Sequence, residues 1–189
     1  MDRDWSFLEQ NSSNGKMKRV VDAAQVEQNS RVVVCLGTQQ FVDYLCMTNP
    51  CVLSVMHYSL LELANIKEKH DSVKCRQGDI VGMPSSSPPL DVVFINCLPA
   101  LNHSLPRIFE ALVRRCAPGA RLIISDTQGR DQLRVHKKYN PDVITGDLPD
   151  QVELEKVLWR YPLQLISFSD EADFYLAVLK VCEDENSKT

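Results

Sequence analysis

Short apolar runs alternate with amphipathic stretches along most of this chain. Five runs are rich in aliphatic and β-branched residues and are bounded by turn residues, as strands buried on both faces are. They cover residues 31–36, 51–55, 73–76, 90–95 and 121–125. Between and around them, apolar residues recur at helical spacing within residues 16–27, 60–66, 105–116 and 150–158. This alternation of strand and helix predicts a parallel sheet with helices on both faces.

The rhythm changes near the C-terminus. Residues 163–168 and 174–181 are β runs joined by five mostly acidic or small residues. That spacing predicts an antiparallel hairpin. The expected fold is therefore α/β: a doubly wound, mostly parallel, Rossmann-like seven-stranded sheet with a C-terminal antiparallel hairpin.

The same pattern divides the chain into three parts. Residues 1–15 are polar and predict a flexible N-terminal arm, in which Trp5, Phe7 and Leu8 are available for docking. Residues 16–182 form the one folded domain, a normal size for 189 residues. Residues 183–189 predict a disordered polar tail.

Composition excludes several classes of protein. The formal net charge is -4, so a general nucleic-acid binder, which needs a basic face, is not expected. The seven cysteines include no C-x-x-C pair and no metal-type spacing, which favours reduced, buried thiols and no metal site. No apolar run approaches ~20 residues, and the acidic start lacks the layout of a signal peptide. A soluble cytoplasmic protein without a membrane role is the expectation.

The predicted topology says where a ligand would bind. In open parallel sheets, ligands lie beyond the carboxyl ends of the strands, where the strand order reverses. The stretches that follow the first four strands are residues 37–41, 56–58, 79–81 and 96–98. We therefore expect these stretches to meet in one crevice.

Three further segments carry a resemblance to a known family. They read Gly-Asp-Ile-Val-Gly-Met-Pro over residues 78–84, Leu-Asp-Val-Val-Phe-Ile-Asn-Cys-Leu over 90–98, and a helix ending in Pro-Gly before the strand at 121–125. The chain resembles the class I S-adenosylmethionine-dependent methyltransferases, in particular their type 11 branch. The resemblance implies S-adenosyl-L-methionine as cofactor and in-line attack on its methyl group. A small-molecule acceptor is favoured, because no nucleic-acid module is appended.

The family's binding residues carry over by position. Asp79 would contact the adenine amino group, with Ile80 beside the ring. The resemblance implies no fixed catalytic residue. The implied cofactor-binding residues are Cys35, Gly37, Met56, His57, Asp79, Ile80 and Asn96, and those at the acceptor's side are Leu98, Asn102 and His103.

The sequence departs from the family at positions that bind the cofactor in the family. No acid ends the first strand at Val34 or Cys35, and only Gly37 remains of the glycines that follow it. Met56 stands where an acid normally holds the ribose hydroxyls. A charge-assisted hydrogen bond contributes about 1.5–3 kcal/mol, so its loss weakens binding by about tenfold to a hundredfold.

Three functions therefore remain open. The first is a methyltransferase with a divergent cofactor site, acting on a small molecule. The second is a catalytically inactive member of the fold, a pseudoenzyme that works as a binding or scaffolding partner of another protein. The third, a different nucleotide-binding protein, lacks the phosphate-cradling loop it would need. His103 is either an exposed loop residue or an acid/base group. Neither the acceptor nor the oligomeric state follows from the sequence.

Overall fold

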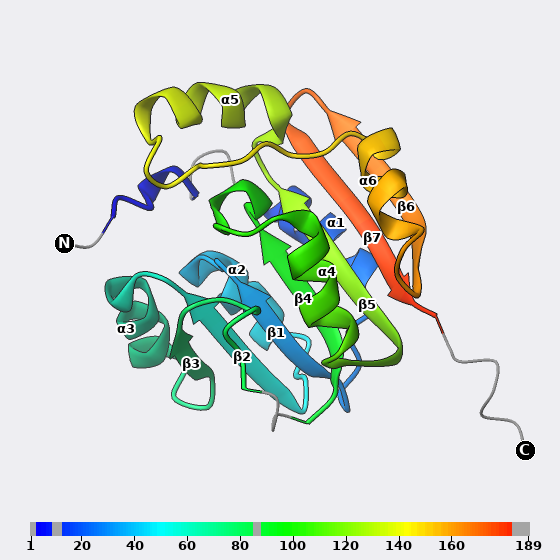
Figure 1. Ribbon diagram of the computed structural model, residues 1–189. Helices are drawn as coiled ribbons and strands as arrows, with labels where there is room; N and C mark the ends of the chain where they lie inside the picture. Colours follow the sequence, from blue (N-terminus) through cyan, green and yellow to red (C-terminus); the bar gives the residue numbers. More distant parts are fainter. Residues whose placement is uncertain (1–2, 9–12, 85–87, 183–189) are drawn as a thin grey trace, which may run out of the picture.

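A single seven-stranded sheet forms the centre of the protein, as Figure 1 shows for this computed structural model. The structure describes residues 3–8, 13–84 and 88–182. The strands, in chain order, are β1 (Arg31–Cys35), β2 (Val52–His57), β3 (Lys74–Gln77), β4 (Leu90–Asn96), β5 (Cys116–Asp126), β6 (Leu163–Glu171) and β7 (Phe174–Val181).

The sheet has the order β3-β2-β1-β4-β5-β7-β6. Strands β1 to β5 pair in parallel, whereas β7 runs antiparallel to both β5 and β6. The predicted doubly wound sheet and its C-terminal hairpin are therefore confirmed. The strand order reverses between β1 and β4, which places the expected ligand crevice above these two strands.

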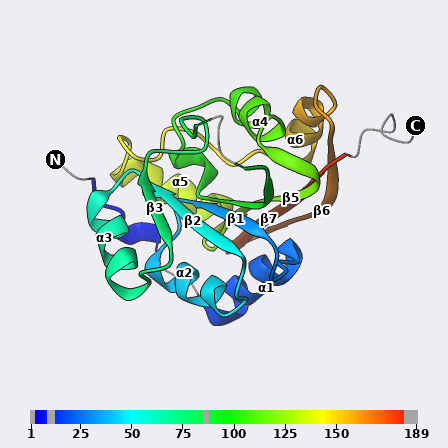
Figure 2. The ribbon, with the colours of Figure 1, turned by 90° about the horizontal axis from the view of Figure 1, so that it is seen from below.

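Helices cover both faces of the sheet, as the view along it in Figure 2 shows. They are α1 (Asn14–Ala24), α2 (Gln39–Cys46), α3 (Leu60–Lys69), α4 (Leu105–Val113), α5 (Gly129–Tyr139) and α6 (Gln151–Leu158). Helices α1, α2 and α3 bury their apolar residues in one core, and α4, α5 and α6 bury theirs in a second core across the sheet. Two short 3₁₀ turns, η1 (Ser6–Leu8) and η2 (Leu98–Ala100), lie near the carboxyl ends of the strands.

Local sequence explains most helix ends, and two predictions need correction. Helix α6 begins with a capping box, in which Asp150 and Glu153 each bond the other's backbone N–H. Helices α2 and α5 were not predicted. The alternation of strand and helix is also interrupted between β3 and β4, where no helix occurs among the described residues of that connection.

The N-terminal segment packs against the domain. Trp5 and Phe7 are only 4% and 3% exposed, and both belong to the core formed with α4, α5 and α6. Helix α1 begins at Asn14, where the Ser13 hydroxyl accepts the Lys16 backbone N–H. Residues 1–15, predicted as a flexible arm, thus include a buried turn; the predicted tail, 183–189, lies outside the described residues.

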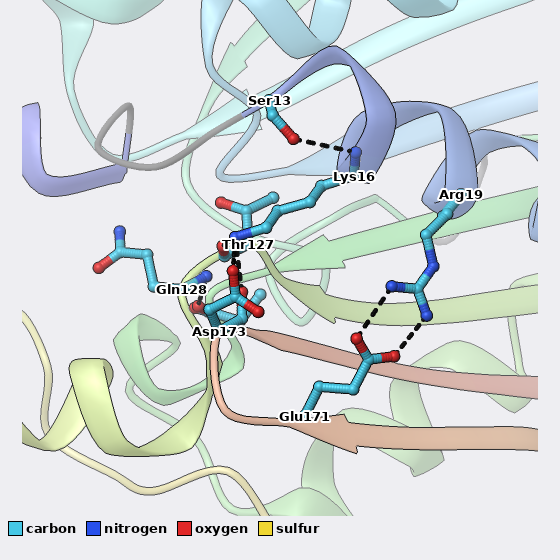
Figure 3. A network of polar contacts seen from close by, with 8 residues as sticks. Ser13, Lys16, Arg19, Thr127, Gln128, Glu171 and Asp173 are labelled. Carbon is cyan, nitrogen blue, oxygen red and sulfur yellow. Dashed lines mark hydrogen bonds and ion pairs between the residues drawn. The ribbon is translucent and has the colours of Figure 1, made fainter.

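Two basic side chains of α1 bond to the loop after β5 and to the C-terminal hairpin (Figure 3). Lys16 Nζ donates to the carbonyls of Thr127 at 2.8 Å and Asp173 at 2.7 Å. The Arg19 guanidinium makes two hydrogen bonds to the Glu171 carboxylate and lies 4.1 Å from the centre of the Phe174 ring. These contacts hold α1 against the loop after β5 and the turn between β6 and β7.

One glycine is required where α5 meets the turn between β6 and β7. Gly129 has a φ of 76°, and a Cβ there would lie 2.9 Å from Ala172 O and Phe174 N. We expect Gly129→Ala to lower the free energy of unfolding by about 2–3 kcal/mol, because strain and a backbone clash combine. Urea denaturation measures this change.

Gly15→Ala provides the matched control. A Cβ at this position in α1 would meet only Ser13 Oγ, at 3.9 Å. The control should be neutral or stabilising by up to about 1 kcal/mol. Equal effects of the two substitutions would show that the α5 contact is not as tight as described.

Candidate ligand site at the strand ends

The structure brings together the residues predicted at the ends of β1, β2 and β4. Cys35 lies beside Met56 on β2 and Ile95 on β4. His57 follows Met56, and Asn96 ends β4. Asp79 and Ile80, which come after β3, are buried at the same edge. The strand ends therefore lie together as the topology predicted.

The Asp79 carboxylate already has a full set of partners. One oxygen accepts the backbone N–H groups of Val81 at 2.9 Å and Gly82 at 3.2 Å. The other accepts the Tyr58 hydroxyl and lies 3.0 Å from His103 Nε2. Burial raises the pKa of Asp79, but these hydrogen bonds and the charge of His103 outweigh burial and hold that pKa below its ordinary value.

The acceptor-side residues separate in the structure. His103 is half-buried and paired with Asp79, so it is neither a free loop residue nor available without breaking that pair. Leu98 is buried in η2. The Asn102 side chain is exposed, while its backbone makes a hydrogen bond with the Tyr58 hydroxyl. These three residues do not form one open pocket mouth.

Aromatic side chains from the N-terminus cover the end of β2. The Trp5 ring meets the His57 ring edge-on at 4.7 Å between centroids and stacks with Tyr58 at 6.1 Å. Phe7 packs against His136 of α5, and its carbonyl accepts a hydrogen bond from the Gln128 side chain. The sequence predicted that these aromatic residues could dock on the domain, but it did not predict where.

Packing against Val34 of β1 explains why residue 37 is a glycine. A Cβ there would lie 2.5 Å from Val34 Cγ1, so the strand end itself requires glycine. Leu36, just before it, is buried with a φ of 58°. Burial raises the pKa of Cys35 to about 12, which keeps it a neutral thiol. Val34 and Cys35 are both fully buried, so neither position presents a polar group to a ligand.

These observations test whether the implied cofactor fits, and as arranged it does not. The ribose has no acid to bind at Met56, which is itself 2% exposed. The adenine partner Asp79 is engaged by Tyr58 and His103. Trp5 packs directly on His57. A nucleoside needs these groups to move before it can bind.

A small cavity remains above β1, β4 and β5. Its volume is about 30 Å³, and a single water needs roughly 10–15 Å³ measured in this way. The Ser125 hydroxyl donates to Asn96 Oδ1 at 2.8 Å beside it. The lining residues are Leu8, Met17, Val20, Leu36, Thr38, Phe41, Asn96, Cys97, Ser125, Asp126, Thr127 and Gln128.

Asp126, at the end of β5, is the acidic residue that lines this cavity. It is 5% exposed, and burial raises its pKa to about 6, against the opposing effects of backbone N–H bonds from Gln128 and Gly129 and the charge of Lys16. Sequence reasoning missed Asp126 because only the first four strand ends were searched. An acid directly after the fifth apolar run was the available signal.

Two other kinds of site are not found within the part of the chain that the structure describes. No group of three His, Cys, Asp or Glu side chains there is placed to hold a metal ion. No helix there is long and apolar enough to cross a bilayer. All seven cysteines are free.

Sequence comparisons identify no relative. No family model matches the chain, and no curated protein sequence matches it. The similarity to known proteins therefore comes from structure.

Solved structures of similar shape are methyltransferases. An S-adenosylmethionine-dependent methyltransferase from Mesorhizobium loti has a TM-score of 0.71 at 10% identity, covering 86% of this chain and 96% of that one. The N-methyltransferase NodS from Bradyrhizobium japonicum, solved with S-adenosyl-L-homocysteine, has 0.69 at 13% identity, covering 97% and 94%.

A third similar structure contains a protein partner. It is a chain from the complex between the Haloferax volcanii Trm112 methyltransferase activator and the protein assigned there as a methyltransferase, with a TM-score of 0.73, 14% identity and 90% of each chain covered. Identities this low concern architecture alone. With the strand order and the reversed β7, they show that this chain has the fold of the class I S-adenosylmethionine-dependent methyltransferases.

Proposed function

We propose that this chain is a catalytically inactive protein of the methyltransferase fold that works by binding a ligand or a protein partner. The observation that carries the proposal is the packing of Trp5 on His57 and Tyr58 at the end of β2. The resemblance placed the cofactor's ribose and adenine at this end of the sheet. In this chain, Trp5 packs on His57 and Tyr58 at that end of β2.

The polar groups support the same conclusion. Asp79 keeps the family's acid, but its oxygens bond Tyr58 and His103 and two backbone N–H groups. Freeing it for an adenine would break hydrogen bonds that already satisfy it. Met56 offers the ribose no acceptor. Binding S-adenosylmethionine would therefore lose existing interactions without the usual ones to replace them.

The second candidate is methyl transfer from S-adenosylmethionine to a small-molecule acceptor, with the N-terminal segment moving aside. One observation favours it besides the shared fold. Within the described part of the chain, Trp5 Nε1 and Gln128 Oε1 are buried without a hydrogen-bond partner. An unpaired buried polar group costs about 1–3 kcal/mol, so the contacts that hold the segment in place are weaker than its burial suggests. A type 11 assignment and a cytoplasmic location belong with this candidate as proposals.

Calorimetric titration with S-adenosylmethionine and S-adenosylhomocysteine distinguishes the two candidates. We expect no binding by the unchanged protein at 1 mM ligand. Trp5→Ala, which removes the covering ring, should also show none. Trp159→Ala is the matched control, because Trp159 is 77% exposed. Circular dichroism checks that each variant is folded.

The outcomes separate cleanly. Micromolar binding by the unchanged protein would overturn the proposal. Binding that appears only in Trp5→Ala would establish the second candidate, in which the N-terminal segment gates an otherwise competent site. Absence of binding in all three folded proteins supports the inactive one.

A further titration tests whether the site is merely weakened by its missing residues. The double variant Met56→Asp, Gln39→Gly restores an acid beside the ribose position and a glycine after β1. We expect no binding at millimolar ligand, since Trp5 and the engaged Asp79 remain. A gain to a dissociation constant below about 100 μM, more than tenfold, would contradict the proposal and favour a divergent enzyme.

A further inference from the structure

Asp126 carries a negative charge that its surroundings compensate poorly. The side chain is buried at the end of β5. No Lys, Arg or His forms an ion pair with it among residues 3–8, 13–84 and 88–182. A buried charge without a partner is costly, and proteins normally pair it or neutralise it.

Its local structural role accounts for only part of this arrangement. Asp126 Oδ1 accepts the Gln128 backbone N–H at 2.9 Å, and the Gly129 N–H also bonds the carboxylate at the start of α5. Partial positive charge at a helix start lowers the pKa of a nearby acid. Burial nevertheless dominates and raises the pKa of Asp126 to about 6. An asparagine would make the same turn without the charge.

The neighbouring groups do not supply the missing cation. Lys16 attracts Asp126, but Lys16 Nζ is bound to the carbonyls of Thr127 and Asp173 and to the Asp173 carboxylate at 2.9 Å. Burial raises the pKa of Cys97 well above its ordinary value, so that thiol is neutral. Tyr175, opposite Asp126 on β7, is held neutral too, with its hydroxyl donating to Pro149 O.

Asp126 is one of the residues that line the cavity of about 30 Å³. It has room for two or three heavy atoms rather than a nucleoside. Thr38, Asn96 and Thr127 are half-buried at its edge, so solvent reaches it from their side. Asn96, whose Oδ1 accepts the Ser125 hydroxyl, also lines it.

We propose that this cavity binds the head of a small organic ammonium compound, with Asp126 as its anionic partner. An ammonium group supplies the positive counter-charge that Asp126 lacks. Its N–H groups bond a carboxylate strongly. An anion would be repelled, and a neutral alcohol would leave the charge unpaired. The inference gives the proposed binding role a ligand class. It does not depend on S-adenosylmethionine, so its failure and that of the proposed function are distinguishable.

Nuclear magnetic resonance of the ¹⁵N-labelled protein tests the site. The Gln128 and Gly129 amides, which bond Asp126, should shift saturably with methylammonium chloride at constant ionic strength. Methanol, of the same size, should give no saturable shift. Asp126→Asn should weaken methylammonium binding at least tenfold, while Asp142→Asn, which removes an exposed acid, should leave it unchanged.

The pH dependence is a second readout. Because the carboxylate must be ionised and its pKa is about 6, binding should strengthen about tenfold between pH 5 and pH 7.5. Shifts that never saturate, equal binding by Asp126→Asn, or equal binding of methanol would each overturn the proposal.

Thermal unfolding tests the poorly compensated charge itself. The folded-state pKa of Asp126 lies above the unfolded value of 3.8. The contribution of this side chain to stability is therefore greatest at low pH and is lost as the pH rises through about 6. Asp126→Asn removes that loss and should raise the melting temperature at pH 7.5 more than at pH 5. If Asp126→Asn melted at a lower temperature than the unchanged protein at pH 7.5, the charge would be stabilising and the inference would be contradicted.

Discussion

The packing of Trp5 over the end of β2, and of Phe7 against α5, is the constraint on which this account of the strand ends depends. The two rings contact His57, Tyr58 and His136, which come from distant parts of the chain. Because they lie where a parallel sheet presents its ligands, they convert an expected crevice into part of the core. The Lys16 and Arg19 contacts hold the following helix in a compatible position (Figure 3).

Under the proposed function, this protein has the methyltransferase fold without the methyltransferase reaction. The fold requires strand order, two apolar cores and short turns, all of which the chain retains. The reaction requires acids and an open crevice at the strand ends. Met56 stands where the resemblance implies one of these acids, and Asp79 is engaged by internal partners. Function depends on the site that a fold carries, and the similar structures share the fold.

The sequence predicts the sheet well because its signals are local. Buried parallel strands appear as continuous apolar runs, and the terminal hairpin as two runs with a short turn. Helix α5 was missed because Leu133 and Gly129 are its only buried residues, which leaves a weak pattern. Helix α2 was missed because residues 37–41, which include its first turn, were interpreted as a ligand-binding stretch after the first strand.

The site was predicted less completely, for a different reason. Topology alone places Asp79 and Asn96 at the strand ends. Their occupancy depends on contacts between distant residues, such as Trp5 with His57 and Tyr58 with Asp79. No periodicity encodes such pairings. Asp126 was detectable from topology but lies one strand beyond those considered.

The position of Trp5 can be measured directly, because the chain has only one other tryptophan. In a Trp159→Phe variant, fluorescence reports on Trp5 alone. The account predicts a blue-shifted emission that acrylamide quenches weakly and that 1 mM S-adenosylmethionine leaves unchanged. An emission typical of water-exposed tryptophan, or one that the ligand shifts towards exposure, would show that the strand ends are not closed by this side chain.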